Sequence, residues 1–319
     1  MNKFIRRLLD TETMKLYLTG SSAKLLSREI ATELRGRCIT REIFPLSFSE
    51  YLEFNKVRSP KHPSSKVKSA LTNHLQKYLH QGGFPEIQSI AKEFHRELLQ
   101  DYVDTVIYRD IAERYEISNL PVLKRFILHC LQNAASSLSI NKIYNTFRSM
   151  GLSIGKNSLY EYLGYIEDSY CVFSVPAFEL SARKSGLKPK KIYPVDPGLT
   201  TAYTLKDSME HAARLETAVF VHLRKQGQPI FYFDMPSGYE VDFLIQKDNG
   251  TIELTQACLS IKDPDTKKRE LRALEEAMQI LQVKQATIVT LDESEEIIVQ
   301  SGLIRCVPFM IWSSNFSED

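Results

Sequence analysis

Five cationic side chains fall within the ten residues 182–191, near the middle of the chain: Arg183, Lys184, Lys188, Lys190 and Lys191. Gly186 interrupts the run, which is typical of a hairpin-like loop that holds its charges close together. Lys and Arg neutralise phosphates and release bound counterions, so the loop predicts a salt-dependent affinity for nucleic acid. The alternative is a solvated loop on a helical domain that contacts only protein.

Two helices are predicted directly before this loop. Ile140, Ile143 and Phe147 recur at helical spacing after Ser139, a residue type that favours helix N-caps, and Gly151 ends the first helix. The second helix starts near Ser158, and the order of helix, turn, helix and basic hairpin is that of a winged helix. Such helices place their N-terminal residues against DNA. The residues that we expect to contact nucleic acid there are Lys156, Asn157, Ser158 and Tyr160.

A second set of chemically suited residues lies in the last third of the chain, where Glu216, Glu240 and Asp242 supply carboxylates. The predicted order is a helix over 215–225, strands over 230–234, 240–246 and 251–256, a helix over 266–281 and a strand over 285–290. This order resembles the restriction-endonuclease-like fold. In its catalytic form an Asp on one strand and Glu-x-Lys on the next hold magnesium and activate water. The resemblance implies Asp242 as the metal ligand.

The strand expected to carry Glu-x-Lys does not supply the full set. If Glu253 is the glutamate, Thr255 occupies the lysine position; if Gln256 replaces the lysine, Leu254 occupies the glutamate position. Glutamine is tolerated at the lysine position in some members of that fold. We expect an inactive domain that contacts nucleic acid or protein. The alternative is a metal-dependent nuclease acting through Asp242, Glu253 and Gln256.

The N-terminal region alternates between strands and helices. A strand over 15–19, a helix over 23–34, a strand over 38–44 and a helix over 47–54 are typical of a parallel α/β sheet. A phosphate-binding loop of the form G-x-x-x-x-G-K-[ST] is not found. The nearest segment, GLSIGKN at 151–157, has one residue too few between its glycines and no Ser or Thr after its lysine.

Several short motifs carry a resemblance over essentially the whole chain. Thr19-Gly20-Ser21-Ser22, Arg35-Gly36-Arg37 and FPLSFSEYL (44–52) resemble the sensor-strand region of AAA-type ATPases. The closest group is the bacterial and archaeal family with a C-terminal domain of unknown function. Further motifs agree in order: GGFPEI (82–87), YRDIAERYEISN (108–119), KIYPVDPGL (191–199) and EVDFLI (240–245).

The resemblance implies a nucleotide site that this sequence does not carry by itself. In that family a phosphate-binding strand and a magnesium-binding acidic strand precede the sensor strand, and this sequence begins after both. We therefore expect that this chain alone binds neither ATP nor magnesium and does not hydrolyse ATP. Three explanations for the missing nucleotide-binding strands remain open: a truncated product, a split gene whose partner chain supplies the ATPase core, or a decayed relative.

If a core is supplied, the resemblance implies roles for three residues. Thr19 and Ser21 would orient the attacking water or sense the γ-phosphate. Arg37 would act as an arginine finger on the transferring phosphoryl group. The alternative for Arg37 is a cation that ends a helix favourably.

The bulk composition is that of a soluble cytoplasmic protein. The chain has 319 residues with a net charge of +2, five scattered cysteines without CxxC spacing, and no apolar run long enough to cross a membrane. We expect a multidomain α/β and α protein with a DNA-associated or regulatory role; a non-enzymatic scaffold is a further alternative. The predicted parts are an ATPase-core remnant (1–57), a helical connector (58–118), a winged-helix domain (119–205) and a restriction-endonuclease-like domain (206–319).

One long amphipathic helix is predicted over residues 93–115. Its apolar stripe is expected to contain Leu98, Tyr102, Val106 and Ile111.

Overall fold

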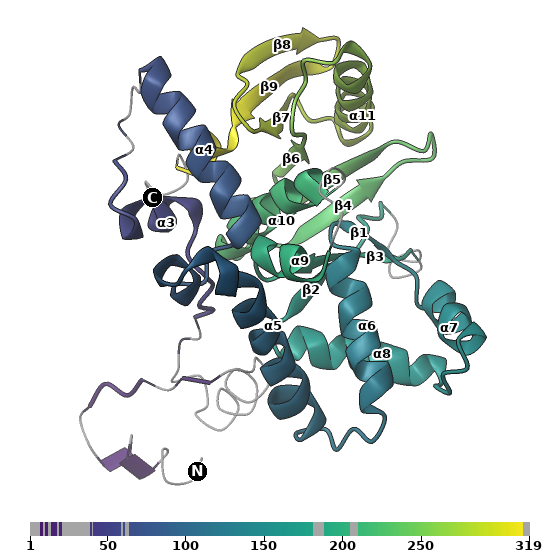
Figure 1. Ribbon diagram of the computed structural model, residues 1–319. Helices are drawn as coiled ribbons and strands as arrows, with labels where there is room; N and C mark the ends of the chain where they lie inside the picture. Colours follow the sequence, from purple (N-terminus) through teal and green to yellow (C-terminus); the bar gives the residue numbers. More distant parts are fainter. Residues whose placement is uncertain are drawn as a thin grey trace. The chain divides into compact units, whose positions relative to one another are not determined.

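The computed structural model describes residues 7–8, 10–11, 14–17, 19–20, 39, 41–58, 60, 64–180, 188–204 and 210–314. The chain divides into two compact units. The first unit comprises Met1–Ile43, Tyr102–Ile127 and Ile140–Phe173, and the second comprises Phe44–Asp101, Leu128–Ser139 and Ser174–Asp319. Figure 1 shows the elements in chain order. Each unit is assembled from three separate stretches of the chain.

The first unit is helical. It contains the end of α5 (His95–Thr105), the π-helical segment Val106–Ala112, the start of α6 (Leu120–Gln132), α7 (Ile140–Ser149), α8 (Lys156–Asp168) and the start of β2 (Val172–Val175). Helix α7 buries Ile140, Ile143 and Phe147, as the spacing predicted. Helix α8 buries Leu159, Tyr162, Leu163 and Ile166. Gly151, with φ of +77°, ends the turn after α7 where a left-handed conformation is needed.

The second unit contains two sheets. In the three-stranded sheet the order is β1 (Ser136–Leu138), β3 (Lys190–Pro194), β2. The central strand, β3, is therefore the one that comes last of these three in the sequence. The six-stranded sheet has the order β4-β5-β6-β7-β9-β8. Its strands are β4 (Ile230–Asp234), β5 (Glu240–Gln246), β6 (Ile252–Ala257), β7 (Gln285–Thr290), β8 (Glu295–Val299) and β9 (Gly302–Pro308). Pairing is antiparallel from β4 to β6 and between β8 and β9, and parallel from β6 through β7 to β9.

The helices of the second unit begin and end at residues suited to those positions. They are α3 (Phe48–Phe54), α4 (Ser65–Gln81), α9 (Pro197–Tyr203), α10 (Glu210–Lys225), α11 (Pro264–Leu281) and α12 (Phe309–Trp312), with short 3-10 turns at Glu86–Ser89 and Lys92–Phe94. A capping box between Ser47 and Glu50 starts α3, and Asp263 followed by Pro264 starts α11. Gly82, with φ of +81°, ends α4.

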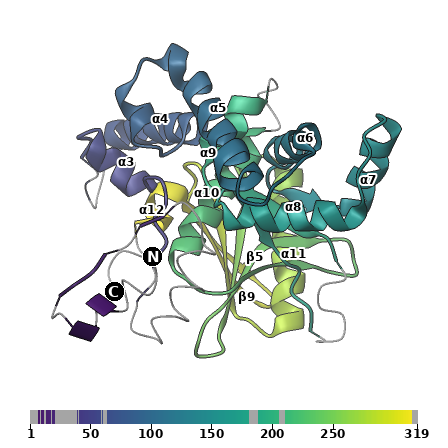
Figure 2. The same ribbon diagram turned by 90° about the horizontal axis from the view of Figure 1, so that it is seen from below.

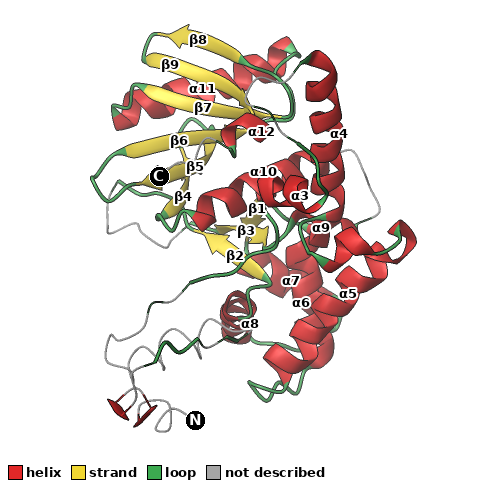
Figure 3. Cartoon of the chain, turned by 90° about the vertical axis from the view of Figure 1, so that its left-hand side faces the viewer, coloured by secondary structure: helices red, strands yellow, loops and turns green. Residues whose placement is uncertain are grey.

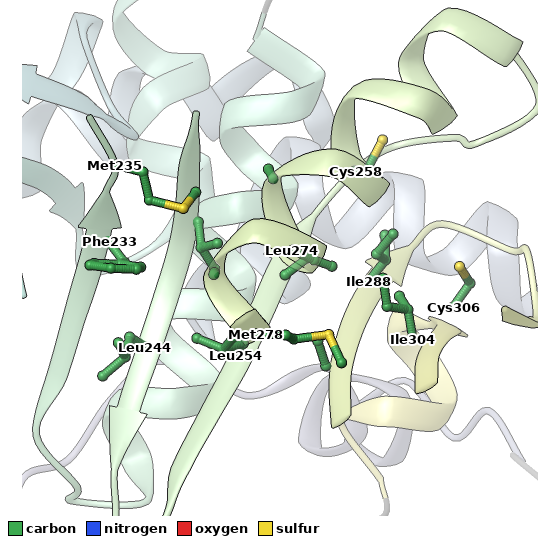
Figure 4. Packing of buried hydrophobic residues seen from close by; sticks show 14 of the residues in the cluster. Phe233, Met235, Leu244, Leu254, Cys258, Leu274, Met278, Ile288, Ile304 and Cys306 are labelled. Carbon is green, nitrogen blue, oxygen red and sulfur yellow. The ribbon is translucent and has the colours of Figure 1, made fainter. Parts of the chain in front are cut away.

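A hydrophobic core holds α11 against the six-stranded sheet. Leu274 and Met278 of α11 lie among Leu244, Leu254, Ile288 and Ile304 of the strands (Figure 4). Ala273 and Ala277 of α11 belong to the same buried cluster. Figure 3 shows α11 running along this sheet, with α10 among the other helices of the unit. Because Phe243 stacks near Phe220 of α10, the side chains of neighbouring residues 243 and 244 face α10 and α11 respectively.

The four described cysteines, Cys130, Cys171, Cys258 and Cys306, are buried and free. Burial raises the pKa of the Cys171 thiol to about 12, which keeps it protonated and unreactive. No helix among the described residues combines the length and the apolar character that crossing a bilayer requires.

Candidate functional site

The most strongly charged buried site of the second unit is a lysine surrounded by carboxylates. The ammonium of Lys191, on β3, lies 2.6 Å from Glu240 Oε1, 2.9 Å from Asp242 Oδ1 and 3.0 Å from Glu216 Oε1. Tyr193, two residues further along β3, donates its hydroxyl to the same Glu216 oxygen at 2.8 Å. We call these five residues the Lys191 cluster. It joins β3 of the three-stranded sheet to β5 and to helix α10.

An irregularity in β5 directs Asp242 into this cluster. Phe231 pairs with Leu244 and Phe233 pairs with Val241, so two residues of β5 oppose one residue of β4. The extra residue lies at Asp242–Phe243, which is a β-bulge. As a consequence Asp242 and its neighbour Phe243 both face α10, whereas a regular strand would turn Asp242 towards α11.

Burial and mutual charge set the protonation of the cluster. Burial alone would lower the pKa of Lys191, but Asp242 and the other acidic neighbours raise it well above its ordinary value. Burial and the Asp242 carboxylate raise the pKa of Glu216 to about 8, against the effect of Lys191. Glu216 Oε1 accepts from both Lys191 and Tyr193. The carboxyl of Glu216 is therefore expected to lose its proton at a higher pH than an exposed glutamate.

Gln256 lies beside Asp242 and connects its backbone to α11. Its side-chain oxygen accepts the backbone N–H of Asp242 at 2.9 Å, and its side-chain amide donates to Glu270 of α11 at 2.9 Å. The second carboxylate oxygen of Asp242 accepts the N–H of Ala257 at 3.0 Å. Gln256 thus lies opposite Asp242 where β5 pairs with β6. The position two residues further on is the buried Cys258.

Glu253 lies apart from the other predicted nuclease residues. It pairs with Ile245 in the β5–β6 ladder and forms an ion pair with Lys247. The structure therefore brings together Glu216, Glu240 and Asp242, sets Gln256 next to them, and leaves Glu253 outside. The two registers considered from the sequence for the glutamate and lysine positions remain predictions.

The chemistry of the Lys191 cluster is that of a buried ion-pair network. A divalent cation would need the carboxylate oxygens that Lys191 already occupies. Among the described residues, no group of three or more His, Cys, Asp or Glu side chains is arranged to hold a metal ion. Lys191 was predicted to bind nucleic acid in the basic loop. That prediction is wrong, because the side chain is buried and paired with three acids.

The other predicted cations of the loop differ in their surroundings. Lys188 pairs with Asp234 at 2.9 Å and lies 3.6 Å from Glu179, while Lys190 is exposed. Arg183 and Lys184 lie outside the described residues. The segment before the loop also joins the six-stranded sheet: Ala177 bridges to Tyr232 in parallel, and Phe178 packs against Phe231 and Phe233.

The start of α8 presents a polar surface in the first unit. Lys156, Asn157 and Tyr160 are exposed and Ser158 is half-buried, so the helix turns these residues away from its apolar face as predicted. The ammonium of Lys156 lies 5.2 Å from the ring centre of Tyr144 on α7. The first turn of α8 contains no acidic residue.

Of the three N-terminal residues predicted to assist ATP hydrolysis, only one belongs to the described residues. Thr19 is exposed, and Ser21 and Arg37 lie outside the described residues. The strand predicted over 15–19 is absent at the described residues 14–17 and 19–20. A strand of this kind needs neighbouring strands to pair its backbone groups. Leu16, Tyr17, Ile39 and Ile43 are exposed instead.

A buried junction that sequence reasoning missed explains two of the motifs. Asp196 is 1% exposed, and its carboxylate accepts the N–H of Gly83 at 2.7 Å and that of Gly198 at 2.8 Å. A Cβ on Gly83 would lie 2.1 Å from the carbonyl oxygen of Leu46, and a Cβ on Gly198 would lie 2.5 Å from that of Gln81. The sequence features that could have indicated this junction are the paired glycines of GGFPEI and the Asp-Pro-Gly of KIYPVDPGL.

Two family models match separate parts of the chain. The family described as an AAA domain matches residues 1–52, and a domain of unknown function, DUF8612, matches residues 72–210. An uncharacterized protein of Haemophilus influenzae is 29% identical over 245 residues, covering 77% of this chain and 59% of its own length. The uncharacterized protein MJ1637 of Methanocaldococcus jannaschii is 26% identical over 270 residues, covering 76% of this chain and 55% of its own length. No solved structure matches.

A more similar relative covers nearly the whole chain. The uncharacterized protein MJ1544 of Methanocaldococcus jannaschii is 36% identical over 326 residues, which is 99% of this chain and 72% of the relative. The chain thus spans between about half and three quarters of the length of these relatives. The chain belongs to the same family as MJ1544 of Methanocaldococcus jannaschii.

Proposed function

We propose that this chain is the nucleic-acid-contacting part of an AAA-type ATPase relative, and that the start of α8 makes the contact. The observation that carries the proposal is the separation of α8 into a buried apolar face and an exposed polar one that begins with Lys156 and Asn157. Recognition helices use these first residues to reach phosphates and base edges.

The order of elements around α8 supports the same assignment. Helix α6, strand β1, helices α7 and α8, and strands β2 and β3 follow one another, and the sheet order is β1-β3-β2. A winged helix has this succession, with its second and third strands framing the loop that contains Arg183 and Lys184. Lys190 is the exposed described cation at the end of that loop.

The AAA-domain match supports a connection to nucleotide hydrolysis through a further α/β core. Within the matched residues 1–52, Tyr17 is 83% and Ile43 is 88% exposed. In a parallel sheet such apolar residues are covered by helices on both faces. We propose that the remaining ATPase core, in the same or a partner chain, covers them. ATP and magnesium would be held there, with Thr19, Ser21 and Arg37 assisting.

The experiment for the nucleic-acid role is a titration of fluorescent duplex DNA with the full chain at several salt concentrations. Each phosphate contact contributes about 0.9 to the slope of log affinity against log salt, so a clear negative slope is expected. Lys156→Glu is expected to weaken binding and to flatten the slope. Lys284→Glu, which changes an exposed lysine of the second unit, is the matched control and is expected to bind like wild type.

Two results would contradict the proposal. Absence of salt-dependent binding would remove the nucleic-acid role and leave the scaffold alternative, since a protein contact requires no counterion release. Equal losses in Lys156→Glu and Lys284→Glu would move any binding away from α8. For the ATPase connection, the purified chain is expected to hydrolyse ATP at background rate; hydrolysis abolished by Arg37→Ala would contradict the need for a further core.

A further inference from the structure

An exposed tyrosine lies on the same surface of α8 as Lys156. Tyr160 is 57% exposed and follows Lys156 by four residues, which places both side chains on one side of the helix. Met150, at the turn between α7 and α8, is also exposed, at 51%. Tyr17, Ile39 and Ile43 of the same unit are more exposed than Tyr160, but they do not belong to α8. Figures 1 and 2 both show α7 and α8 meeting at that turn.

Lys156 is held in position by a second aromatic ring. Its ammonium lies 5.2 Å from the ring centre of the half-buried Tyr144, a cation–π contact that restrains a flexible side chain. The surface therefore combines an open aromatic ring, a restrained cation and the exposed amide of Asn157. Lys156 can pair with a phosphate and Tyr160 can stack on a base, and the two residues are little more than one helical turn apart.

This combination suits unpaired bases better than a closed duplex. In a duplex the base faces are stacked on each other, and only base edges and phosphates are accessible. In a single strand the faces are free, and aromatic side chains stack on them while cations follow the backbone. A ring that is more than half exposed gains most from a ligand that covers its face.

We infer that the α8 surface binds single-stranded nucleic acid, with a base stacked on Tyr160 and the adjacent phosphate paired with Lys156. The inference rests on the proposed nucleic-acid role of α8 and names the form of nucleic acid that this site takes.

The test compares a fluorescent single-stranded oligonucleotide with the duplex of the same sequence, both titrated with the full chain at several salt concentrations. Wild type is expected to bind the single strand more tightly. Tyr160→Ala is expected to weaken single-strand binding about tenfold, whereas Tyr160→Phe, which keeps the ring, stays within about twofold of wild type. Tyr160→Leu keeps the bulk of an apolar side chain without the aromatic face and is expected to behave like Tyr160→Ala. Circular dichroism checks that each variant is folded.

Tyr108→Ala is the matched control. Tyr108 is 46% exposed with the Lys124 ammonium 5.8 Å from its ring centre, on the π-helical segment instead of α8. It is expected to leave single-strand affinity unchanged. Lys156→Ala is expected to reduce the single-strand salt slope by about 0.7.

The outcomes separate this inference from the role on which it rests. Salt-dependent duplex binding with no single-strand preference, or equal losses on both forms in Tyr160→Ala, overturns the inference and leaves the nucleic-acid role. Wild-type affinity in Tyr160→Leu also overturns it, since bulk without an aromatic face would then suffice. Absence of salt-dependent binding to either form overturns both and points to a protein partner on this surface.

Discussion

The ammonium of Lys191 lies 2.9 Å from a carboxylate oxygen of Asp242, at the bulge of β5, and both side chains are buried. In the nuclease interpretation, Asp242 would use that oxygen to hold a metal ion and Lys191 would face a nucleic acid. Their direct contact assigns both residues to an internal ion pair that links two sheets of the second unit.

Removing the cation from this cluster is expected to destabilise the fold strongly. Lys191→Met leaves the buried Asp242 and the partly buried Glu216 and Glu240 together without a positive charge, and breaking one partner of a buried pair typically costs about 3–5 kcal/mol. Urea unfolding followed by circular dichroism measures the change. Lys247→Met removes the partner of Glu253 at an exposed ion pair of the β5–β6 hairpin and is expected to cost less than about 1 kcal/mol. Similar losses in the two variants would show that the Lys191 cluster is not desolvated.

The raised pKa of Glu216 predicts a pH dependence of stability. The pKa of Glu216 is raised from 4.5 to about 8 on folding, so the folded chain binds more protons than the unfolded chain between these values. Stability is therefore expected to fall as pH rises from about 5 to 8, by up to about 1.4 kcal/mol per unit. Glu216→Gln, which cannot ionise, is expected to flatten this dependence when unfolding is measured at each pH. Glu253→Gln serves as control, and a Glu216→Gln profile parallel to wild type would contradict the assignment.

The glycines at the Asp196 junction are expected to resist substitution. Gly83→Ala puts a methyl group 2.1 Å from the Leu46 carbonyl oxygen and is expected to cost about 1–3 kcal/mol or more. Gly164→Ala, in α8, meets nothing within 4 Å and is expected to stabilise by up to about 1 kcal/mol, because alanine is the better helix former. Thermal unfolding of both variants decides the point; a neutral Gly83→Ala would mean that α4 and its neighbours can separate.

DNA cleavage is not expected from the second unit. Lys191 pairs with the carboxylates of Glu216, Glu240 and Asp242, and the side chain opposite Asp242 on β6 is the amide of Gln256. Wild type and Asp242→Asn are therefore expected to be indistinguishable when plasmid DNA is incubated with magnesium or manganese. Metal-dependent nicking by wild type that Asp242→Asn abolishes would restore the nuclease interpretation.

Local periodicity determined most of the secondary structure of the second unit. The strands predicted over 230–234, 240–246 and 285–290 agree with β4, β5 and β7, and the helix predicted over 266–281 agrees with α11 to within two residues. These segments alternate or repeat strongly enough for the sequence itself to indicate their type. In the long helix predicted over 93–115, Ile111 is buried as predicted. The other buried positions are Leu99, Val103 and Ile107, each one residue after the predicted Leu98, Tyr102 and Val106, and the spacing of four continues across a π-helical segment.

Contacts between distant residues were decided only by the tertiary structure. The sequence by itself determined which residues are charged, where glycines permit close approach, and which face of α8 is polar. It did not reveal that the Lys191 side chain is buried, because the residues next to Lys191 in the sequence are compatible both with an exposed basic loop and with a buried strand. The bulge in β5 brings Asp242 to Lys191, and Asp196 meets Gly83 across more than a hundred residues. Such pairings depend on strand register and on helices packing together, which no local pattern encodes.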